Sequence, residues 1–335
     1  MLMSLSIGIV GLPNVGKSTL FNALTKKSVP AENYPFCTID PSVGIVPVPD
    51  ERLWKLSELS KSKKTIPAVI EFVDIAGLVK GASVGEGLGN KFLSNIREVD
   101  AILEMVRAFK DDDIIHVHGK IDPLSDIGVI NLELVLADEE TVNKRLQNLQ
   151  KDVKAQNKSA IAEEKVLQKV FEVLKRGELV NTLDLNSEEK LVVKGMHLLT
   201  EKPILYCLNT SDVSSENILE IKNDLPGLHV EVDPVFEKGF DDLIKKSYET
   251  LNLITYFTTG EDETRAWTIT KGWTAPMAGT AIHTDFKDKF IRAEVIHCDD
   301  LLASGSYASA REKGLVRTEG KEYVVKDGDV IEFRI

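Results

Sequence analysis

Gly11-Leu12-Pro13-Asn14-Val15-Gly16-Lys17-Ser18 is the stretch of this chain that decides its fold. It matches the G-x-x-x-x-G-K-[ST] pattern of a phosphate-binding loop. An apolar run at residues 5–10 precedes it and predicts a buried strand, while residues 19–24 carry the one-sided apolar pattern of a helix. Strand, glycine loop and helix in this order are the context that the motif requires, and they predict binding of a nucleotide's phosphates.

Each residue type in this loop has a chemical task. The two glycines let the backbone wrap closely round a triphosphate, so that successive N–H groups face the anionic oxygens. We expect Lys17 to reach the β- and γ-phosphates and the Ser18 hydroxyl to ligate Mg²⁺.

A second motif, Asp74-Ile75-Ala76-Gly77, follows an apolar stretch at residues 69–73 and fits the D-x-x-G of nucleotide-switch proteins. We expect Asp74 to hold Mg²⁺ through water and the Gly77 N–H to sense the γ-phosphate. Thr38 lies between the two motifs, where a switch threonine completes the magnesium shell. The alternative for Thr38 is a hydroxyl in a turn.

Residues 77–89 contain five glycines, which predict a loop that orders on the triphosphate and relaxes after hydrolysis, or else a long surface turn. In small signalling GTPases a glutamine after D-x-x-G orients the attacking water. Here that residue is Leu78, which neither donates nor accepts a hydrogen bond. His116 is our candidate for the task, because an imidazole orients water near neutral pH. The alternatives are a half-buried strand histidine and, with His118, a metal pair that lacks a third ligand.

The candidate base-reading motif is Asn209-Thr210-Ser211-Asp212, which follows an apolar run at residues 204–208. It occupies the place of N-K-x-D, whose Asp accepts hydrogen bonds from guanine and repels adenine. This chain keeps the Asn and the Asp and has Thr210 in place of the Lys. The S-A-K sequence that contacts guanine O6 is missing, since the expected region reads Val230-Glu231-Val232-Asp233-Pro234-Val235-Phe236-Glu237. Spacing alone therefore leaves both ATP and GTP open.

The composition narrows the class of protein. The chain has 335 residues, with 41 Lys+Arg against 53 Asp+Glu and a net charge of −12. This predicts a globular protein of two or more domains and argues against a DNA coat or a polybasic membrane binder. No run of about 18 apolar residues predicts a transmembrane helix, and the N-terminus lacks the basic region of a signal peptide. Three scattered cysteines fit a reducing cytoplasm.

The middle of the chain carries a different pattern. Apolar residues recur at spacings of three and four in residues 142–153 and 167–174, which predicts an α-hairpin or short antiparallel coiled coil. Residues 144–176 hold nine basic and four acidic side chains, a net charge of +5 within an acidic chain, for which an ordinary solvated helix face is one interpretation. We expect Ser187 to cap a third helix. The tail predicts a small β domain, with short alternating stretches at 290–296 and 323–325 and a final strand at 330–335.

Several motifs together resemble the Obg-like ATPase (YchF) family, and the likeness covers nearly the whole chain. They are GLPNVGKSTLFNALT at 11–25, YPFCTI at 34–39, EFVDIAGLVKGAS at 71–83, GEGLGN at 85–90, and RAWTI, AGTAIHTDF, FIRAEV and VVKDGDVIEF within 265–333. The resemblance implies three parts: a P-loop switch domain with a Rossmann-like parallel α/β sheet, a helical coiled-coil insertion, and a C-terminal TGS domain of ubiquitin-like β-grasp fold. Their expected bounds are 1–137 with 198–252, 138–197, and 253–335.

The resemblance also implies a function. Family members are slow magnesium-dependent ATPases of GTPase ancestry that prefer ATP and associate with ribosomes in the cytoplasm. The implied partners are a large subunit or 70S-type particle and its RNA, contacted by the basic arm and the TGS domain, with no membrane and no specific DNA. A GTP-specific switch in translation or ribosome assembly is the alternative, and a metabolic P-loop kinase or a scaffold that never turns its nucleotide over fits the motifs less well.

The implied site residues follow the same motifs. The phosphates are contacted by Asn14, Val15, Gly16, Lys17, Ser18 and Thr19, magnesium by Ser18 and Thr38, and the base by Asn209 and Thr210. Leu78 matches the family's hydrophobic replacement of glutamine, and His116 falls where the family carries a switch histidine. There are two departures: Asp212 stands where the family has Glu, and the stretch from Asp212 to Phe240 is shorter than expected.

Overall fold

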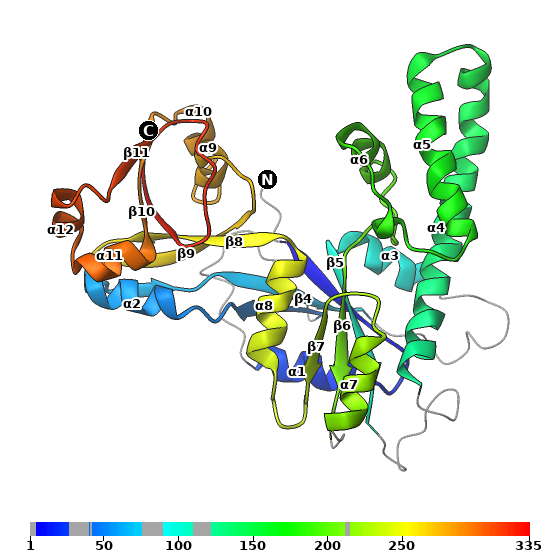
Figure 1. The fold of residues 1–335 in the computed structure, drawn as a ribbon, viewed down its shortest axis with the longest axis horizontal. Coiled ribbons are helices and arrows are strands. Elements are labelled where there is room, and N and C mark those ends of the chain that lie inside the picture. The colour runs from blue at the N-terminus through cyan, green and yellow to red at the C-terminus, as the bar shows by residue number, and fades with distance from the viewer. Residues whose placement is uncertain (1–4, 27–39, 41, 76–89, 110–121, 212–214) are drawn as a thin grey trace. The chain divides into compact units, whose positions relative to one another are not determined.

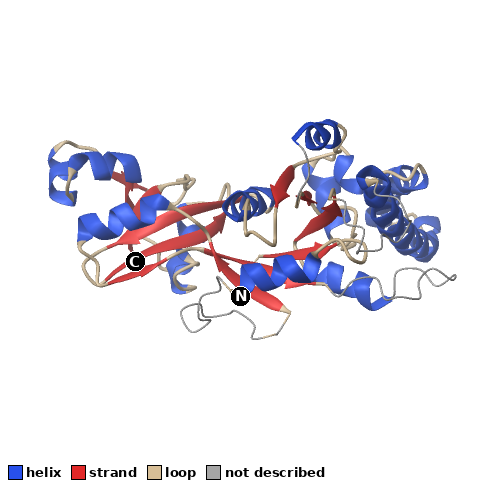
Figure 2. Cartoon of the chain, turned by 90° about the horizontal axis from the view of Figure 1, so that it is seen from below, coloured by secondary structure: helices blue, strands red, loops and turns tan. Residues whose placement is uncertain are grey.

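The computed structural model describes residues 5–26, 40, 42–75, 90–109, 122–211 and 215–335, and Figures 1 and 2 draw the other segments in grey. Within the described residues the chain packs as two compact units. Of the described residues, one unit comprises 5, 24–26, 40, 42–72 and 240–335, and the other comprises 6–23, 73–75, 90–109, 122–211 and 215–239. The predicted domain bounds stay a prediction.

Six strands form the first sheet, in the order β2-β4-β1-β5-β6-β7. They are β1 (Ser6–Val10), β2 (Val43–Pro47), β4 (Val69–Asp74), β5 (Ala101–Arg107), β6 (Ile204–Asn209) and β7 (His229–Val232). β1, β5 and β6 are buried along their whole length, as continuous apolar runs predict. β5 pairs in parallel with β1 and β6, and β7 pairs in parallel with β6. Parallel strands bring their carboxyl ends to one edge of the sheet, where the motifs that follow β1 and β6 therefore meet.

Helices connect these strands. Those in the first 100 residues and around β7 are α1 (Lys17–Thr25), α2 (Glu51–Ser60), α3 (Asn90–Glu98), α7 (Ser215–Asn223) and α8 (Phe240–Thr250). α1 begins directly at the predicted phosphate loop, which confirms the strand–loop–helix order expected from the sequence. No helix of the described residues combines the length and the apolarity needed to cross a membrane.

A long helical hairpin leaves the first sheet after β5. α4 (Pro123–Lys154) and α5 (Lys158–Lys175) lie side by side (Figure 1), followed by a 3₁₀ turn (Val180–Thr182) and α6 (Ser187–Lys194). The hairpin core is made by the apolar residues that the sequence spacing predicts, among them Val142, Leu149, Leu167 and Val170. Burying each such side chain stabilises the hairpin by about 1.5–3 kcal/mol, which compensates for the helices' marginal stability in isolation.

The cap of α6 differs from the prediction by one residue. Asn186, and not Ser187, is the N-cap: its side chain accepts hydrogen bonds from the Glu188 and Glu189 N–H groups. The Glu189 side chain accepts in return from the Asn186 N–H, which completes a capping box. The glutamate three positions after Asn186 is the sequence signal for this cap.

The tail folds around a second, mixed sheet in the order β11-β10-β12-β8-β9-β3. Its strands are β3 (Lys64–Ile66), β8 (Leu253–Thr259), β9 (Glu263–Thr270), β10 (Arg292–His297), β11 (Arg317–Glu319) and β12 (Asp329–Arg334). Its short helices are α9 (Ala275–Gly279), α10 (Asp285–Asp288), α11 (Cys298–Ser304) and α12 (Tyr307–Glu312). Strands predicted at 290–296 and 330–335 are present with shifted ends. The alternation at residues 323–325 does not form a strand, because only Val324 makes an isolated bridge, to Thr274.

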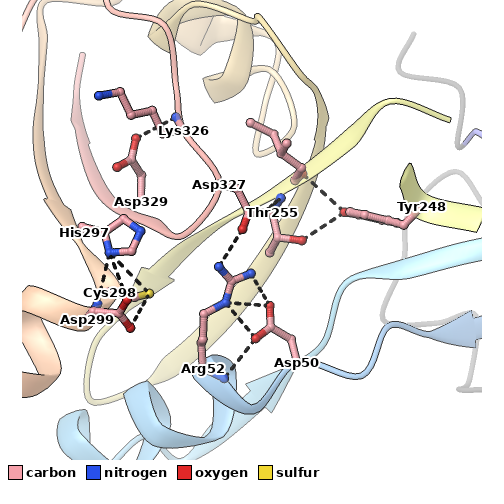
Figure 3. A network of polar contacts seen from close by, with 11 residues as sticks. Asp50, Arg52, Tyr248, Thr255, His297, Cys298, Asp299, Lys326, Asp327 and Asp329 are labelled. Carbon is pink, nitrogen blue, oxygen red and sulfur yellow. Dashed lines mark hydrogen bonds and ion pairs between the residues drawn. The ribbon is translucent and has the colours of Figure 1, made fainter. Parts of the chain in front are cut away.

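Residues of α2 are joined to the tail by one ion-pair network (Figure 3). The Arg52 guanidinium donates to both Asp50 oxygens and, at 2.7 Å, to Asp327 Oδ2. The other Asp327 oxygen accepts from the Thr255 N–H of β8. Arg52 also lies 5.3 Å from the centre of the Phe257 ring. The hydrogen bonds to the paired carboxylates, above all to Asp50, raise the pKa of Arg52 above its ordinary value, so the guanidinium stays charged and paired at every ordinary pH.

Candidate functional site

The loop between β1 and α1 has a backbone that only glycine permits at two points. Gly11 has φ +151°, and a Cβ there would lie 2.5 Å from the Met105 carbonyl oxygen of β5. Gly16 has φ +102°, and a Cβ there would lie 2.6 Å from Asn209 Nδ2 of β6. Both glycines therefore let the loop press against neighbouring strands. Asn14, at the loop's exposed side, also has a positive φ of 63°.

Lys17 lies inside this loop and is 9% exposed. Its Nζ donates to the Gly11 and Leu12 carbonyl oxygens, both at 2.8 Å. Burial lowers the pKa of Lys17 to about 8, an effect that the nearby Asp74 carboxylate opposes. The amine is thus bound by two neutral carbonyl oxygens of the loop, which the oxygens of a phosphate group can replace.

Asp74 ends β4 and is half-buried. Burial raises the pKa of this carboxyl group, while the charge of Lys17 lowers it. Ser18 and Thr19, in the first turn of α1, are exposed. A carboxylate and a hydroxyl beside the phosphate loop are the hard oxygen donors that Mg²⁺ prefers, so the described residues fit this ion.

Asn209, at the end of β6, connects the phosphate loop to the start of the candidate base-reading motif (the base-side loop, described at residues 209–211). Its Nδ2 donates to the Val15 carbonyl oxygen at 3.0 Å, and its Oδ1 accepts from the Ser211 hydroxyl at 3.1 Å. The Thr210 N–H donates to the Val232 carbonyl oxygen of β7 at 2.9 Å. The residues expected from two motifs almost 200 positions apart are therefore in contact.

Four sequence-predicted site residues lie outside the described residues, so their placement stays a prediction. They are the switch Thr38, Gly77 of D-x-x-G, the candidate water-orienting His116, and Asp212. The same holds for Leu78, for His118 and for the glycine-rich segment.

Two residues near the site were missed by the sequence analysis. Arg107 ends β5 opposite Asn209 and is 1% exposed; its Nε donates to the Phe109 carbonyl oxygen and its guanidinium lies 4.4 Å from the centre of that ring. The available signal was a charged residue at the end of an apolar strand. Asp233, the first residue after β7, accepts from the Ser211 hydroxyl at 3.1 Å. No local pattern marks it, because its position depends on the pairing of β6 with β7.

Comparisons with known proteins agree with this geometry. Residues 6–158 match the family model of 50S ribosome-binding GTPases, and residues 253–335 match the YchF-type GTPase C-terminal domain, described as a protein of unknown function. The ribosome-binding ATPase YchF of Bacillus subtilis is 52% identical over 363 residues, covering 99% of both chains. This chain belongs to the YchF family. Its counterpart in Haemophilus influenzae is 47% identical, again over 99% of both chains.

The solved structure of the Schizosaccharomyces pombe YchF GTPase has the same fold. It superimposes with a TM-score of 0.86 at 38% identity and covers 100% of this chain and 98% of that one. The predicted family and fold class are thereby confirmed. The alignment with the Bacillus subtilis YchF spans 363 positions against the 335 residues of this chain, so that relative carries residues that this chain lacks.

Proposed function

We propose that this chain is a magnesium-dependent ATPase switch that binds the ribosome. The observation that carries the proposal is the phosphate loop itself: its glycine backbone is seated against β5 and β6, its lysine lies inside it, and Asn209 locks the base-side loop to it. Full-length membership in a family whose curated relatives are named ribosome-binding ATPases supports the choice of activity.

The residues of this chain divide the work on the nucleotide. Backbone N–H groups of residues 14–19 bind the phosphates, aided by the positive end of α1. The Lys17 amine exchanges its two carbonyl acceptors for β- and γ-phosphate oxygens. Ser18, Asp74 and Thr38 hold the magnesium ion, which neutralises charge on the phosphate oxygens when bound. Gly77 senses the γ-phosphate, and His116 orients the attacking water that Leu78 cannot orient.

Ribosome contact is assigned to the tip of the hairpin, together with the tail domain. Along the hairpin, exposed cations pair with glutamates: Lys144 with Glu140, and Arg145 with Glu163. Three exposed lysines lie close together at the tip without an ion pair among the described residues: Lys151, Lys154 and Lys158. Lys165 and Lys175, further along α5, also make no ion pair with a described residue. Unpaired cations at the end of a long arm fit the phosphate backbone of ribosomal RNA on the large subunit or a 70S-type particle. This partner places the protein's action in the cytoplasm.

One experiment tests the ATPase and its dependence on the loop. Single-turnover hydrolysis of ATP is measured for the wild-type chain and for Lys17→Ala, with and without ribosomes. We expect the variant to lose at least about 100-fold in rate, because the transition-state charge loses its partner. Hydrolysis at the wild-type rate in Lys17→Ala contradicts the site, and no turnover of wild type under either condition supports a scaffold instead.

A parallel titration with GTP tests the alternative substrate. Asp212 is the guanine-type residue of the motif, and it is the observation that favours a GTPase. We expect tighter binding of ATP. Binding of GTP ten or more times tighter than ATP would replace the ATPase by the GTPase assignment.

Co-sedimentation with ribosomes tests the arm. Reversing the three tip lysines to Glu is expected to abolish pelleting at moderate salt. A charge-matched control reverses three exposed lysines elsewhere: Lys55, Lys61 and Lys245. Equal loss in the control, or full pelleting of the tip variant, removes the tip from the ribosome interface.

A further inference from the structure

The connection between β7 and α8 is a short, fixed turn. β7 ends at Val232 and α8 begins at Phe240. The Asp233 N–H donates to the Lys238 carbonyl oxygen and the Lys238 N–H donates back to that of Asp233, both at 3.1 Å. Gly239 closes the turn with φ +77°, and a Cβ there would lie 2.1 Å from the Glu231 carbonyl oxygen. Two backbone hydrogen bonds and a position that requires glycine therefore define the shape of this turn.

Within the turn, the two oxygens of Asp233 differ. Oδ1 accepts from the Val235 and Phe236 N–H groups and from the Ser211 hydroxyl, each at 3.1 Å. Oδ2 accepts no hydrogen bond from any residue that the structure describes. The turn holds the carboxylate by one oxygen and leaves the other as an available acceptor.

The turn also lacks a donor that other nucleotide switches supply. The residue after Asp233 is Pro234, which has no backbone N–H. In guanine-specific switches the loop at this place contacts guanine O6, and Asp233-Pro234 takes the place of that S-A-K loop. Two consecutive residues thus present acceptor groups and no free backbone donor.

Strand register places the turn beside the nucleotide site. β6 and β7 pair in parallel, with Asn209 opposite Val232, and Asn209 donates to Val15 of the phosphate loop. Asp233 therefore follows β7 at the same sheet edge at which Asn209 follows β6. Its carboxylate is joined to the base-side loop through Ser211. Ligands of parallel α/β sheets bind at this edge.

We propose that Asp233 and Pro234 select the base by the group at position 6 of the purine. Adenine carries an amino donor there, whereas guanine and hypoxanthine carry a keto acceptor. A donor pairs with the available carboxylate oxygen. A keto oxygen, which is partly negative, is repelled by the carboxylate and finds no N–H donor at residue 234. A base with a keto group is therefore disfavoured both by this repulsion and by the missing hydrogen bond. This inference rests on the proposed nucleotide-binding function and assigns its specificity to residues outside the N-x-x-D motif.

Asp233→Asn is the sharpest test, because it changes one atom's role. The amide oxygen keeps the three donors now held by Oδ1, and the amide nitrogen puts a donor at the position of Oδ2. Dissociation constants are measured for ATP and for inosine triphosphate, whose bases differ in the group at position 6 and in the hydrogen that hypoxanthine carries on the adjacent N1. We expect the preference for ATP over inosine triphosphate to fall at least about tenfold in the variant.

Pro234→Ala is the second variant, which restores an N–H without touching the carboxylate. We expect it to improve the binding of inosine triphosphate about three- to tenfold and to leave ATP binding within twofold. Val235→Ala serves as the matched control, since it shortens an exposed side chain in the same turn while keeping Pro234 and both Asp233 oxygens, and it is expected to leave the ratio unchanged.

The outcomes separate the two proposals. If wild type binds ATP through Lys17 but both variants keep the wild-type ratio within twofold, the base-reading assignment is wrong and the nucleotide site stands. If wild type binds neither nucleotide, both are wrong. A misfolded Asp233→Asn variant leaves the Pro234→Ala ratio to decide.

Discussion

ATP binding by this chain is expected to weaken about tenfold between pH 7 and pH 9, through one amine. Burial lowers the pKa of Lys17 to about 8 in the ligand-free loop. At the upper pH about nine tenths of the amines are neutral, and the triphosphate must restore the proton before the amine can pair with it. The affinity therefore falls about tenfold, or about 1.4 kcal/mol, relative to neutral pH.

The assay is isothermal titration calorimetry with a non-hydrolysable ATP analogue and magnesium. At pH 8, titrations in two buffers of different ionisation enthalpy give the proton uptake, which we expect to be about half a proton per site. Lys17→Arg is the control, because its guanidinium stays charged throughout this range and its affinity is expected to be independent of pH. A wild-type affinity that is constant from pH 7 to pH 9, with no proton uptake, refutes the reasoning.

Three further predictions follow from single side chains. Glu104 in β5 is 1% exposed and neither carboxylate oxygen has a hydrogen-bond partner among the described residues, so Glu104→Met is expected to stabilise the chain by about 1–3 kcal/mol in urea unfolding. Burial, with help from the nearby Asp126 charge, raises the pKa of Glu104, so the stability of the wild-type chain falls as pH rises above about 4.3. The stability gained by Glu104→Met is therefore expected to be larger at pH 8 than at pH 5, and a gain that is no larger at pH 8 contradicts this reasoning. Arg52→Met removes two ion pairs and is expected to lower the free energy of unfolding by about 1.5–3 kcal/mol. Lys55→Met on the same helix removes one exposed ion pair, at 3.5 Å from Glu51, and is expected to change the stability little. Equal losses of stability in the two variants would mean that the Arg52 network is not the cause. His116→Ala is expected to slow single-turnover hydrolysis without weakening ATP binding, and equal loss of both would give the histidine a structural role.

Local spacing was enough to predict the phosphate loop. Gly11, Gly16 and Lys17 stand at fixed intervals after an apolar run, and the chemistry of a glycine loop constrains each of them. The same holds for the hairpin, whose apolar positions repeat every three or four residues over many turns. These features depend on residues that are neighbours in sequence, so a single sequence reveals them.

Features that depend on strand pairing were not predictable in this way. Asp233 lies beside the base-side loop because β6 and β7 pair in register, and no spacing in the sequence encodes that register. Glu104 lies in an apolar run that otherwise predicts a buried strand. The lack of a hydrogen-bond partner for its carboxylate among the described residues becomes visible only in the folded structure. The stretch at 323–325 alternates like a strand, yet its Tyr323 carbonyl accepts from Ala275 and its Val325 N–H donates to Trp273, outside any ladder.

The most direct test of the whole account is a crystal structure of the chain with magnesium and a non-hydrolysable ATP analogue. We predict that the β- and γ-phosphates accept hydrogen bonds from the backbone N–H groups between Asn14 and Thr19. We also predict that the Lys17 amine has left the Gly11 and Leu12 carbonyl oxygens for the phosphates. A loop with no nucleotide in it, or a nucleotide bound elsewhere while Lys17 keeps its carbonyl partners, would contradict the account.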